Sequence, residues 1–197
     1  MAELRLLTAE QLEQVYHRYM KVDFPPSERR PLASIRRLRQ SGHYDTWGLW
    51  AGETLSGYAF LWRTEGEECA LLDYLAVCPG ERGRGWGTLA LELIKTRYGE
   101  GCPILAEAEA PEKGAPPEQN EPRRRRLDFY RRAGFRLLDY ETLIFGVRYA
   151  MLVWPASCAM DAEALQAAHR GLYQSQMPPY LFRRMIRIPA PDCGKKE

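Results

Sequence analysis

The sequence predicts a mixed α/β fold in which a mostly antiparallel sheet contains one parallel strand pair and is flanked by helices. Two observations carry this prediction. Segments 46–51, 55–63 and 70–77 are largely apolar and are separated by short turns, as in an antiparallel meander. The last segment then enters a glycine-rich turn, a helix and a further strand at 104–108, which indicates a parallel crossover.

The N-terminal part is expected to form a strand and two helices before the meander begins. Residues 4–7 are the strand candidate. Apolar residues at helical spacing predict a helix over about 9–22, with Thr8 and Gln11 forming a capping box at its start. Residues 23–30 include two consecutive prolines and are expected to form a loop, after which a second, shorter helix follows.

The C-terminal part is expected to continue with a helix, two antiparallel strands and a last amphipathic helix. The helix should end at Gly134, a favourable C-terminal cap. Asp161 should cap the last helix, whose apolar face includes His169. The expected ranges are a loop at 110–122, a helix at about 122–133, strands at 135–143 and 147–154, and an extension from 178 onwards.

Composition bounds the possible classes of protein. The 197 residues are 45% apolar and 27% charged, which is typical of a globular protein; we expect one domain over 1–155 and a C-terminal helix and extension over 156–197. A net charge of +2 gives no general electrostatic case for a nucleic-acid partner. The longest apolar stretch, 149–154, is far shorter than the roughly 20 residues that cross a bilayer, so no membrane partner is expected.

Cysteine and histidine usage indicates the compartment. Five cysteines are widely spaced, no CxxC pair occurs, and the three histidines are scattered. Neither a disulfide framework nor a metal site is expected, and a reducing cytoplasm fits this pattern. Monomer and homodimer both remain open.

The most informative segment is the glycine-rich turn after the strand that ends in Leu75-Ala76-Val77. It reads Arg82-Gly83-Arg84-Gly85-Trp86-Gly87-Thr88 and opens a helix. A helix N-terminus presents free N–H groups and the positive end of the helix dipole, glycines allow close backbone approach, and the two arginines add charge. The segment therefore predicts a pyrophosphate-binding turn.

Two nucleotide motifs compete for this turn. A P-loop would require Gly-Lys-Ser/Thr, which is absent. A dinucleotide fingerprint is matched by Gly85, Gly87 and Ala90, with Glu107 about 20 residues further on as a candidate ribose-binding acid. That fingerprint normally opens a run of βαβ units, whereas one such unit can be drawn here. An NAD(P)-binding domain is therefore the alternative interpretation.

Two motifs together resemble the GNAT superfamily of N-acetyltransferases over roughly residues 3–154. The first is the arginine-glycine turn at 82–87 after Leu75-Ala76-Val77, and the second is Phe129-Tyr130-x-x-x-Gly134-Phe135. The resemblance implies a central, splayed parallel strand pair that holds acetyl-CoA as co-substrate. The pyrophosphate would lie on the N–H groups of 82–88, and the pantetheine arm would pair with the backbone of 75–77.

The resemblance further implies that a primary amine of a small molecule or peptide attacks the thioester directly. Tyr130 matches the tyrosine that faces the coenzyme sulfur and would be the acid. Glu107 is our first choice as base, while Asp73 and Glu109 remain alternatives. The loop 24–30 lies where relatives shape the acceptor pocket, so Phe24 and Glu28 are predicted to contact the acceptor.

One departure from the family pattern concerns the position seven residues before Tyr130. The family often has an asparagine there that contacts pantetheine, whereas this chain has Arg123, with Asn120 three residues earlier. Arg123 also begins a run of four arginines that is expected near a helix start, where positive charge is unfavourable. A CoA-binding regulatory module without turnover is the third interpretation of the chain.

Overall fold

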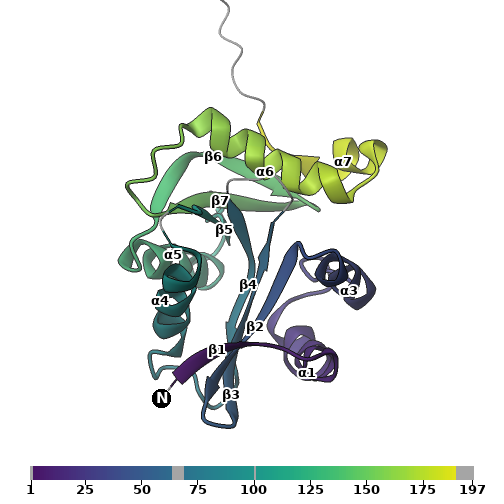
Figure 1. The fold of residues 1–197 in the computed structure, drawn as a ribbon. Helices are drawn as coiled ribbons and strands as arrows, with labels where there is room; N and C mark the ends of the chain where they lie inside the picture. The colour runs from purple at the N-terminus through teal and green to yellow at the C-terminus, as the bar shows by residue number, and fades with distance from the viewer. Residues whose placement is uncertain (1, 64–68, 100, 190–197) are drawn as a thin grey trace, which may run out of the picture. The chain divides into compact units, whose positions relative to one another are not determined.

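The computed structural model describes residues 2–63, 69–99 and 101–189. Within these residues the strands form one mixed sheet in the order β1-β2-β3-β4-β5-β7-β6-β8 (Figure 1). The sheet is mostly antiparallel, with β4 (Ala70–Val77) and β5 (Ile104–Glu109) parallel, as the sequence predicted. The chain divides into two compact units, Met1–Glu65 with Leu72–Gly99 and Gly66–Leu71 with Glu100–Glu197.

The first unit contains the N-terminal helices and the meander. One uninterrupted helical stretch runs through α1, η1 and α2, and Figure 1 shows α1 and α3 on one side of the strands and α4 on the other. The elements are β1 (Ala2–Leu6), α1 (Ala9–Val15), the π-helical η1 (Tyr16–Met20), α2 (Lys21–Asp23), α3 (Leu32–Gln40), β2 (Tyr44–Ala51), β3 (Thr54–Trp62), most of β4, and α4 (Trp86–Tyr98).

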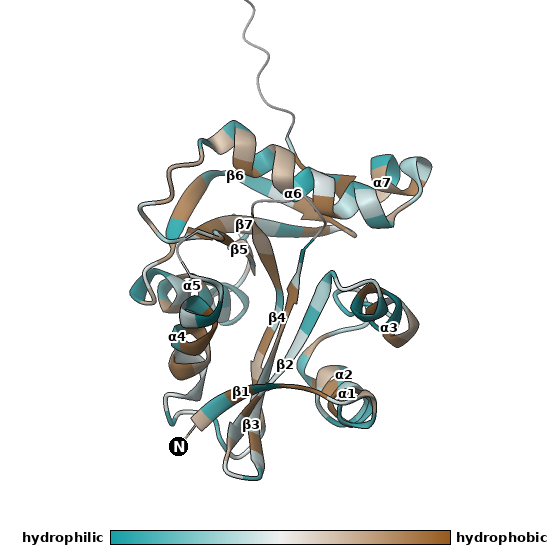
Figure 2. Cartoon of the chain, in the orientation of Figure 1, coloured by the Kyte–Doolittle hydropathy of each residue, from teal (hydrophilic) through white to brown (hydrophobic). Residues whose placement is uncertain are grey.

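Local sequence signals explain several of these boundaries. The Thr8 side chain accepts from the Gln11 N–H, and the Gln11 side chain accepts from the Thr8 N–H, so the predicted capping box is present. The core of the unit is aromatic: the side chains of Tyr58, Phe60 and Trp62 are fully buried. Apolar colouring along β4 in Figure 2 agrees with the prediction that this strand is largely covered.

The second unit contains the last helices and the remaining strands. Asp161 accepts from the Ala164 N–H and caps α6, as predicted. Figure 1 shows α6 running across β6 and β7. The elements are the start of β4, β5, α5 (Pro117–Arg132), β6 (Arg136–Ile144), β7 (Val147–Trp154), α6 (Ala162–Gln176), α7 (Pro179–Met185) and β8 (Ile186–Arg187).

The boundary of α5 corrects one expectation. The loop predicted at 110–122 ends early, because the helix begins at Pro117 and contains Pro122 in its interior. Pro117 is in the first turn, where a missing N–H costs nothing, and Asn120 anchors this turn by bonding both the N–H and the C=O of Glu112. The arginine run 123–126 consequently lies in the middle of α5 and not near its start.

Two short elements extend beyond the predicted ones. Residues from 178 onwards were expected as an extension, and the structure gives them a helix, α7, and the two-residue strand β8. β8 pairs antiparallel with the end of β6, where Leu143 faces Arg187 and Ile144 faces Ile186. The predicted turn at 65–68 lies outside the described residues.

Candidate functional site

The glycine-rich turn leads from β4 into α4 in the first unit and leaves its backbone open. Gly85 is the N-cap of α4 with φ of +82°, and no side chain caps the helix. A Cβ on Gly83 or Gly85 would meet no other heavy atom within 4 Å. The first helical N–H groups, from Trp86 to Thr88, have no intrahelical acceptor by geometry. This turn fits a bound pyrophosphate, because free donors, the helix dipole and open space coincide.

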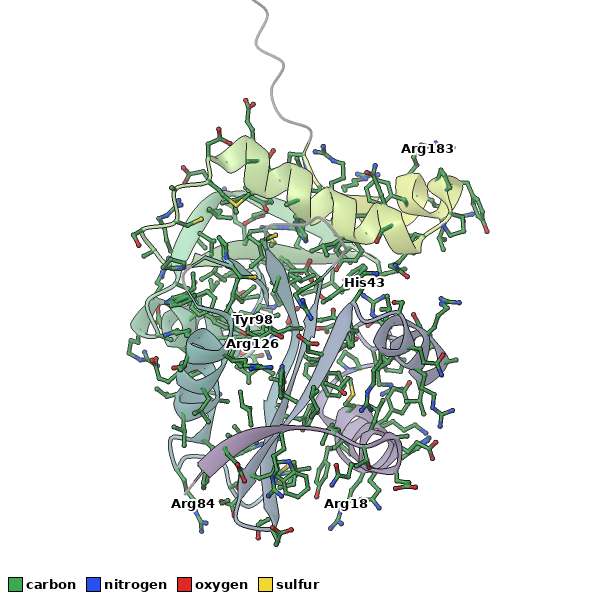
Figure 3. The ribbon with its side chains drawn as sticks, in the orientation of Figure 1. Arg18, His43, Arg84, Tyr98, Arg126 and Arg183 are labelled. Carbon is green, nitrogen blue, oxygen red and sulfur yellow. The ribbon has the colours of Figure 1, made fainter. Side chains whose placement is uncertain are left out.

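The two arginines of the turn differ in their surroundings. Arg84 points outward with 64% of its side chain exposed (Figure 3), and it pairs with Glu81 at 3.3 Å. The Trp86 Nε1–H donates to Glu81 at 2.8 Å. Arg82 instead donates to the Asp23 carboxylate at 2.6 Å and to the Val77 carbonyl at 3.3 Å. The two side chains are similarly exposed, at 63% for Arg82 and 64% for Arg84, and they differ in that Arg82 pairs with the buried Asp23 carboxylate and so fixes the turn.

Asp23 is a residue that the sequence analysis missed. It lies at the end of α2, its side chain is 5% exposed, and it also accepts from the Tyr58 hydroxyl at 2.7 Å. It therefore ties the turn to β3 and to the segment that precedes Phe24. No sequence pattern pairs Asp23 with Arg82, because 59 positions separate them.

Cys78, which follows the strand, is a packing residue by its surroundings. Burial, followed by the nearby Asp23 carboxylate, raises the pKa of its thiol to about 11. The thiol is therefore neutral near pH 7, and a thiol without a thiolate fraction is a poor nucleophile. This agrees with the interpretation from the sequence.

Residues 75–77 of β4 are half-buried, and β3 runs on one side of them. The Cys78 N–H just after them donates to the Ser56 carbonyl at 2.9 Å. A Cβ on Gly57 of β3 would lie 2.8 Å from the Ala76 carbonyl oxygen, so a glycine is required for this close approach. The packing explains Gly57, which the sequence analysis did not single out.

The loop 24–30 is held against β4 by Tyr74. The Tyr74 hydroxyl donates to the Glu28 carbonyl at 2.9 Å and accepts from the Arg30 N–H at 2.7 Å. The Phe24 ring packs edge-on against the Tyr74 ring at 4.9 Å between centroids. Both predicted acceptor-contact residues, Phe24 and Glu28, therefore lie next to the strand whose end is the predicted coenzyme segment.

Asp73, one alternative base, is held by two partners. Arg30 Nε approaches its carboxylate at 3.3 Å, and the Tyr44 hydroxyl also donates to it. Burial raises the pKa of the Tyr44 phenol well above its usual value, with the Asp73 charge as a further cause. The Asp73 carboxylate is therefore already engaged by a guanidinium and a phenol.

Glu109, the other alternative, is held by Arg123 in the second unit. Arg123 donates to the Glu109 carboxylate and lies 3.7 Å from Glu112. The arginine that replaces the family's asparagine thus forms an ion pair with the end of β5. Asn120 is buried and bonds the 112–115 loop backbone.

Glu107, the preferred base, lies on β5 among neutral donors. His169 Nε2 is 2.7 Å from one carboxylate oxygen, and the Tyr173 hydroxyl lies 3.0 and 3.1 Å from the two oxygens. Both partners come from α6. The sequence contained one indication of this contact. His169 lies on the apolar face of the last helix, and a buried histidine requires a polar partner.

Tyr130 lies on α5 in an aromatic cluster. Its ring packs edge-on against Phe129 and Phe135, at 5.4 and 5.3 Å between centroids. Burial raises the pKa of its phenol to about 12, a rise that the Arg126 charge reduces. Among the described residues its hydroxyl has no hydrogen-bond partner. It is therefore a neutral donor over the working pH range.

The predicted site residues divide between the two units. The first unit brings the turn 82–88, the strand segment 75–77 and the loop residues Phe24 and Glu28 together. The second unit holds Glu107 and Tyr130, which share no hydrogen bond within the described residues.

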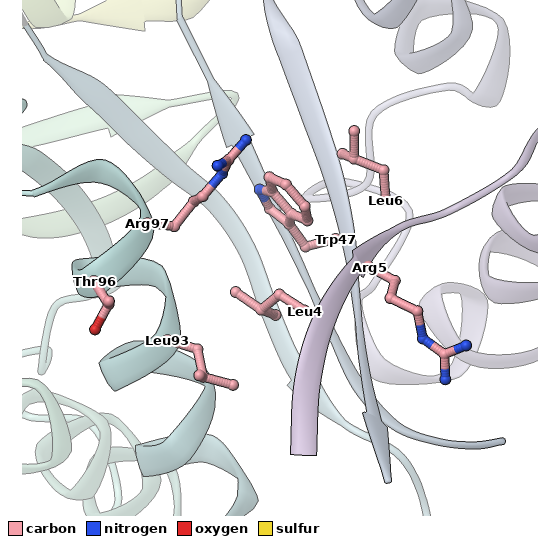
Figure 4. A pocket seen from close by; sticks show the side chains of 7 residues that line it. All are labelled: Leu4, Arg5, Leu6, Trp47, Leu93, Thr96 and Arg97. Carbon is pink, nitrogen blue, oxygen red and sulfur yellow. The ribbon is translucent and has the colours of Figure 1, made fainter. Parts of the chain in front are cut away.

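A groove in the first unit lies apart from these residues. Figure 4 shows side chains from β1, β2 and α4 around it, and its volume is about 720 Å³. Leu4, Leu93 and Trp47 make it apolar, and the Arg97 guanidinium lies over the Trp47 ring at 5.5 Å. None of the predicted coenzyme or acceptor residues lines it.

Two further classes of site were sought in the part of the chain that the structure describes. No group of histidine, cysteine or carboxylate side chains there could hold a metal ion. No helix among those residues has the length and apolar character needed to cross a bilayer.

Comparison with protein-family models finds a match to one family. Residues 9–135 match the model of the acetyltransferase (GNAT) family. No curated protein matches the chain.

Solved structures share the fold at low sequence identity. A Bacteroides thetaiotaomicron protein assigned to the GNAT family has a TM-score of 0.69 at 21% identity, over 88% of this chain and 98% of that one. An acyl-CoA N-acyltransferase from Pseudomonas aeruginosa has a TM-score of 0.55 at 17% sequence identity, and the match covers 78% of this chain and 97% of that one. The ribosomal-protein-S18-alanine N-acetyltransferase from Escherichia coli has a TM-score of 0.54 at 15% sequence identity, and the match covers 82% of this chain and 98% of that one.

Proposed function

Because the chain belongs to the acetyltransferase (GNAT) family, we propose that it transfers the acetyl group of acetyl-CoA to a primary amine. Members of this family use acyl-CoA and acetylate amine acceptors. The observation that carries the proposal is the open glycine-arginine turn at the N-terminus of α4, directly after β4. Its free N–H groups and the exposed Arg84 suit a pyrophosphate.

The topology weighs against the alternative of an NAD(P)-binding domain. Such domains are built from successive parallel βαβ units, whereas this sheet is mostly antiparallel. Glu107, the candidate ribose-binding acid of that alternative, is hydrogen-bonded to His169 and Tyr173. The GxGxxA match at Gly85 is therefore explained by the acyl-CoA turn.

In the proposed reaction the neutral amine attacks the thioester carbonyl, so a C–N bond forms and the C–S bond breaks. Glu107 takes the proton that the amine nitrogen loses, because neutral donors hold it whereas guanidinium groups hold Asp73 and Glu109. Tyr130 donates a hydrogen bond to the departing thiolate. The phenol pKa of about 12 keeps this donor protonated.

We infer that the loop 24–30 forms one wall of the acceptor pocket and that Phe24 and Glu28 contact the acceptor. The loop is stiffened by Pro25 and Pro26 and held by Tyr74, so this wall exists before the acceptor binds. A small-molecule amine and a peptide amine both suit the proposal. The four described cysteines are free, which fits action in the reducing cytoplasm.

The test is acetyl-CoA-dependent release of CoA across a panel of acceptors: a polyamine, free amino acids, an aminoglycoside, a lysine peptide and a peptide with a free N-terminus. We expect release above the hydrolysis background with at least one acceptor, and calorimetric binding of acetyl-CoA but not of NADH. Binding without release across the panel would favour the regulatory-module interpretation, and NADH binding alone would favour the dinucleotide one.

A further inference from the structure

A buried polar cluster in the second unit surrounds Glu107 and includes residues that the proposed reaction does not yet use. His169 is fully buried, and its Nε2 lies 2.7 Å from Glu107 Oε1. Tyr173, one turn further along α6, bonds both carboxylate oxygens. The Tyr140 hydroxyl of β6 faces His169 Nδ1 at 3.5 Å. Three elements therefore converge on one carboxylate.

The chemistry of the partners fixes the tautomer of His169. An ionised carboxylate only accepts hydrogen bonds, so Nε2 must carry the proton that faces Glu107. Nδ1 is then the acceptor, and the Tyr140 hydroxyl is the group that faces it. A polar group therefore faces each nitrogen of the buried His169 ring.

Packing alone does not call for these polar groups. α6 already buries Leu165 and Leu172 completely on the same face. Another apolar residue at 169 would dock the helix without burying polar atoms, which cost free energy unless they are satisfied. The polar face of the cluster is aimed at the residue that we propose as the base, whose side chain is 11% exposed.

We propose that His169 and Tyr173 are positioning residues, which hold the Glu107 carboxylate in one orientation. The C-terminal helix, which lies beyond the residues 9–135 that match the family model, then completes the catalytic machinery. This inference rests on the proposed role of Glu107. In the reaction the amine N–H bond breaks and an O–H bond forms on Glu107.

The polar groups around Glu107 come from β6 and α6. His169 and Tyr173 of α6 bond its carboxylate and Tyr140 of β6 faces His169, while Cys69 and Arg170 lie near the Tyr140 phenol. Burial raises the pKa of the Tyr140 phenol, with the Glu107 charge as the next cause, so Tyr140 stays neutral.

The experiment compares His169→Phe, His169→Gln and Tyr173→Phe in the full chain. His169→Phe keeps a ring but removes the donor, so kcat should fall by roughly tenfold or more. The amide of His169→Gln can reach Glu107 and should restore most of kcat. KM for acetyl-CoA should stay within about twofold.

Two matched controls and a double variant separate positioning from folding. His17→Gln and Tyr180→Phe change an exposed histidine and an exposed tyrosine and should leave kcat unchanged. In a Glu107→Gln background, His169→Phe should cause little further loss, because both changes act on one group.

Contrary outcomes distinguish the inference from the proposed function. A folded His169→Phe variant with unchanged kcat, or losses that multiply with Glu107→Gln, would overturn the positioning role. If His169→Phe does not fold, Tyr173→Phe decides the question, because it should lower kcat and leave KM for acetyl-CoA unchanged. Full turnover in Glu107→Gln would remove the base assignment and the positioning role together, whereas absence of acetyl transfer in the unaltered protein would refute the proposed function itself.

Discussion

At the scale of single residues, Tyr130 combines a buried ring with a hydroxyl that bonds no described residue. Tyr130→Phe keeps the aromatic contacts with Phe129 and Phe135 and removes the donor. We expect turnover to fall by roughly tenfold to a thousandfold, with little change in acetyl-CoA affinity or melting temperature. Single-turnover acetyl transfer measures this directly, and an unchanged rate would return Tyr130 to a packing role. Tyr180→Phe is the exposed control.

Asp23 is a second residue whose effect can be separated into stability and binding. Asp23→Asn weakens a buried acceptor for Arg82 and Tyr58, so the free energy of unfolding should fall by about 1–3 kcal/mol. Because Arg82 fixes the turn that we propose binds the pyrophosphate, acetyl-CoA affinity should fall as well. Urea unfolding and calorimetry check the two effects, with Asp128→Asn, an exposed ion-pair residue on α5, as the control. Unchanged stability would mean that the Asp23 contacts contribute nothing.

At the scale of elements, the turn into α4 carries the clearest prediction. Gly87 lies in the first helical turn, where its backbone should approach the pyrophosphate. Gly87→Val should lower acetyl-CoA affinity by at least tenfold, about 1.4 kcal/mol, with little change in the melting temperature of the free protein. Gly101→Val places the same side chain at an exposed turn and should bind normally. Normal affinity in a folded Gly87→Val variant would remove the turn from the coenzyme site.

Helix α5 shows what local signals could and could not predict at this scale. The predicted C-terminal end of the helix is correct, because Gly134 adopts a φ of +81°, a conformation that favours glycine and ends helices. The predicted start of the helix at Pro122 is wrong. A proline is typical of a helix start, but Pro117 and Asn120 stabilise a turn that precedes it. A side chain that bonds a backbone eight residues away is invisible to a pattern of spacing.

At the scale of the whole molecule, buried tyrosines govern the response to alkaline pH. Burial is the largest cause that raises the pKa of the phenols of Tyr44, Tyr58, Tyr98, Tyr130 and Tyr140. The unfolded chain has phenol pKa values near 10, so below that pH both states are neutral and the stability is fully present. As pH rises above about 10, the unfolded state ionises first and stability is lost.

The expected outcome is that the buried phenols ionise above pH 10, the ordinary value for a free phenol, together with the loss of near-UV circular dichroism. Ionisation of all tyrosines near pH 10 in a protein that keeps its native spectrum would contradict the burial described here.

The sequence by itself determined the order of the elements from β1 to α6, the mixed sheet, the helix caps at Thr8 and Asp161, and the glycine-arginine turn. These features are local, because a cap, a turn or an apolar period is set by residues within a few positions of one another. The tertiary structure alone decided which side chains meet: Asp23 with Arg82, Tyr74 with the loop 24–30, and His169 with Glu107. These partners lie 44 to 62 positions apart, and only folding brings such distant donors and acceptors within hydrogen-bond distance.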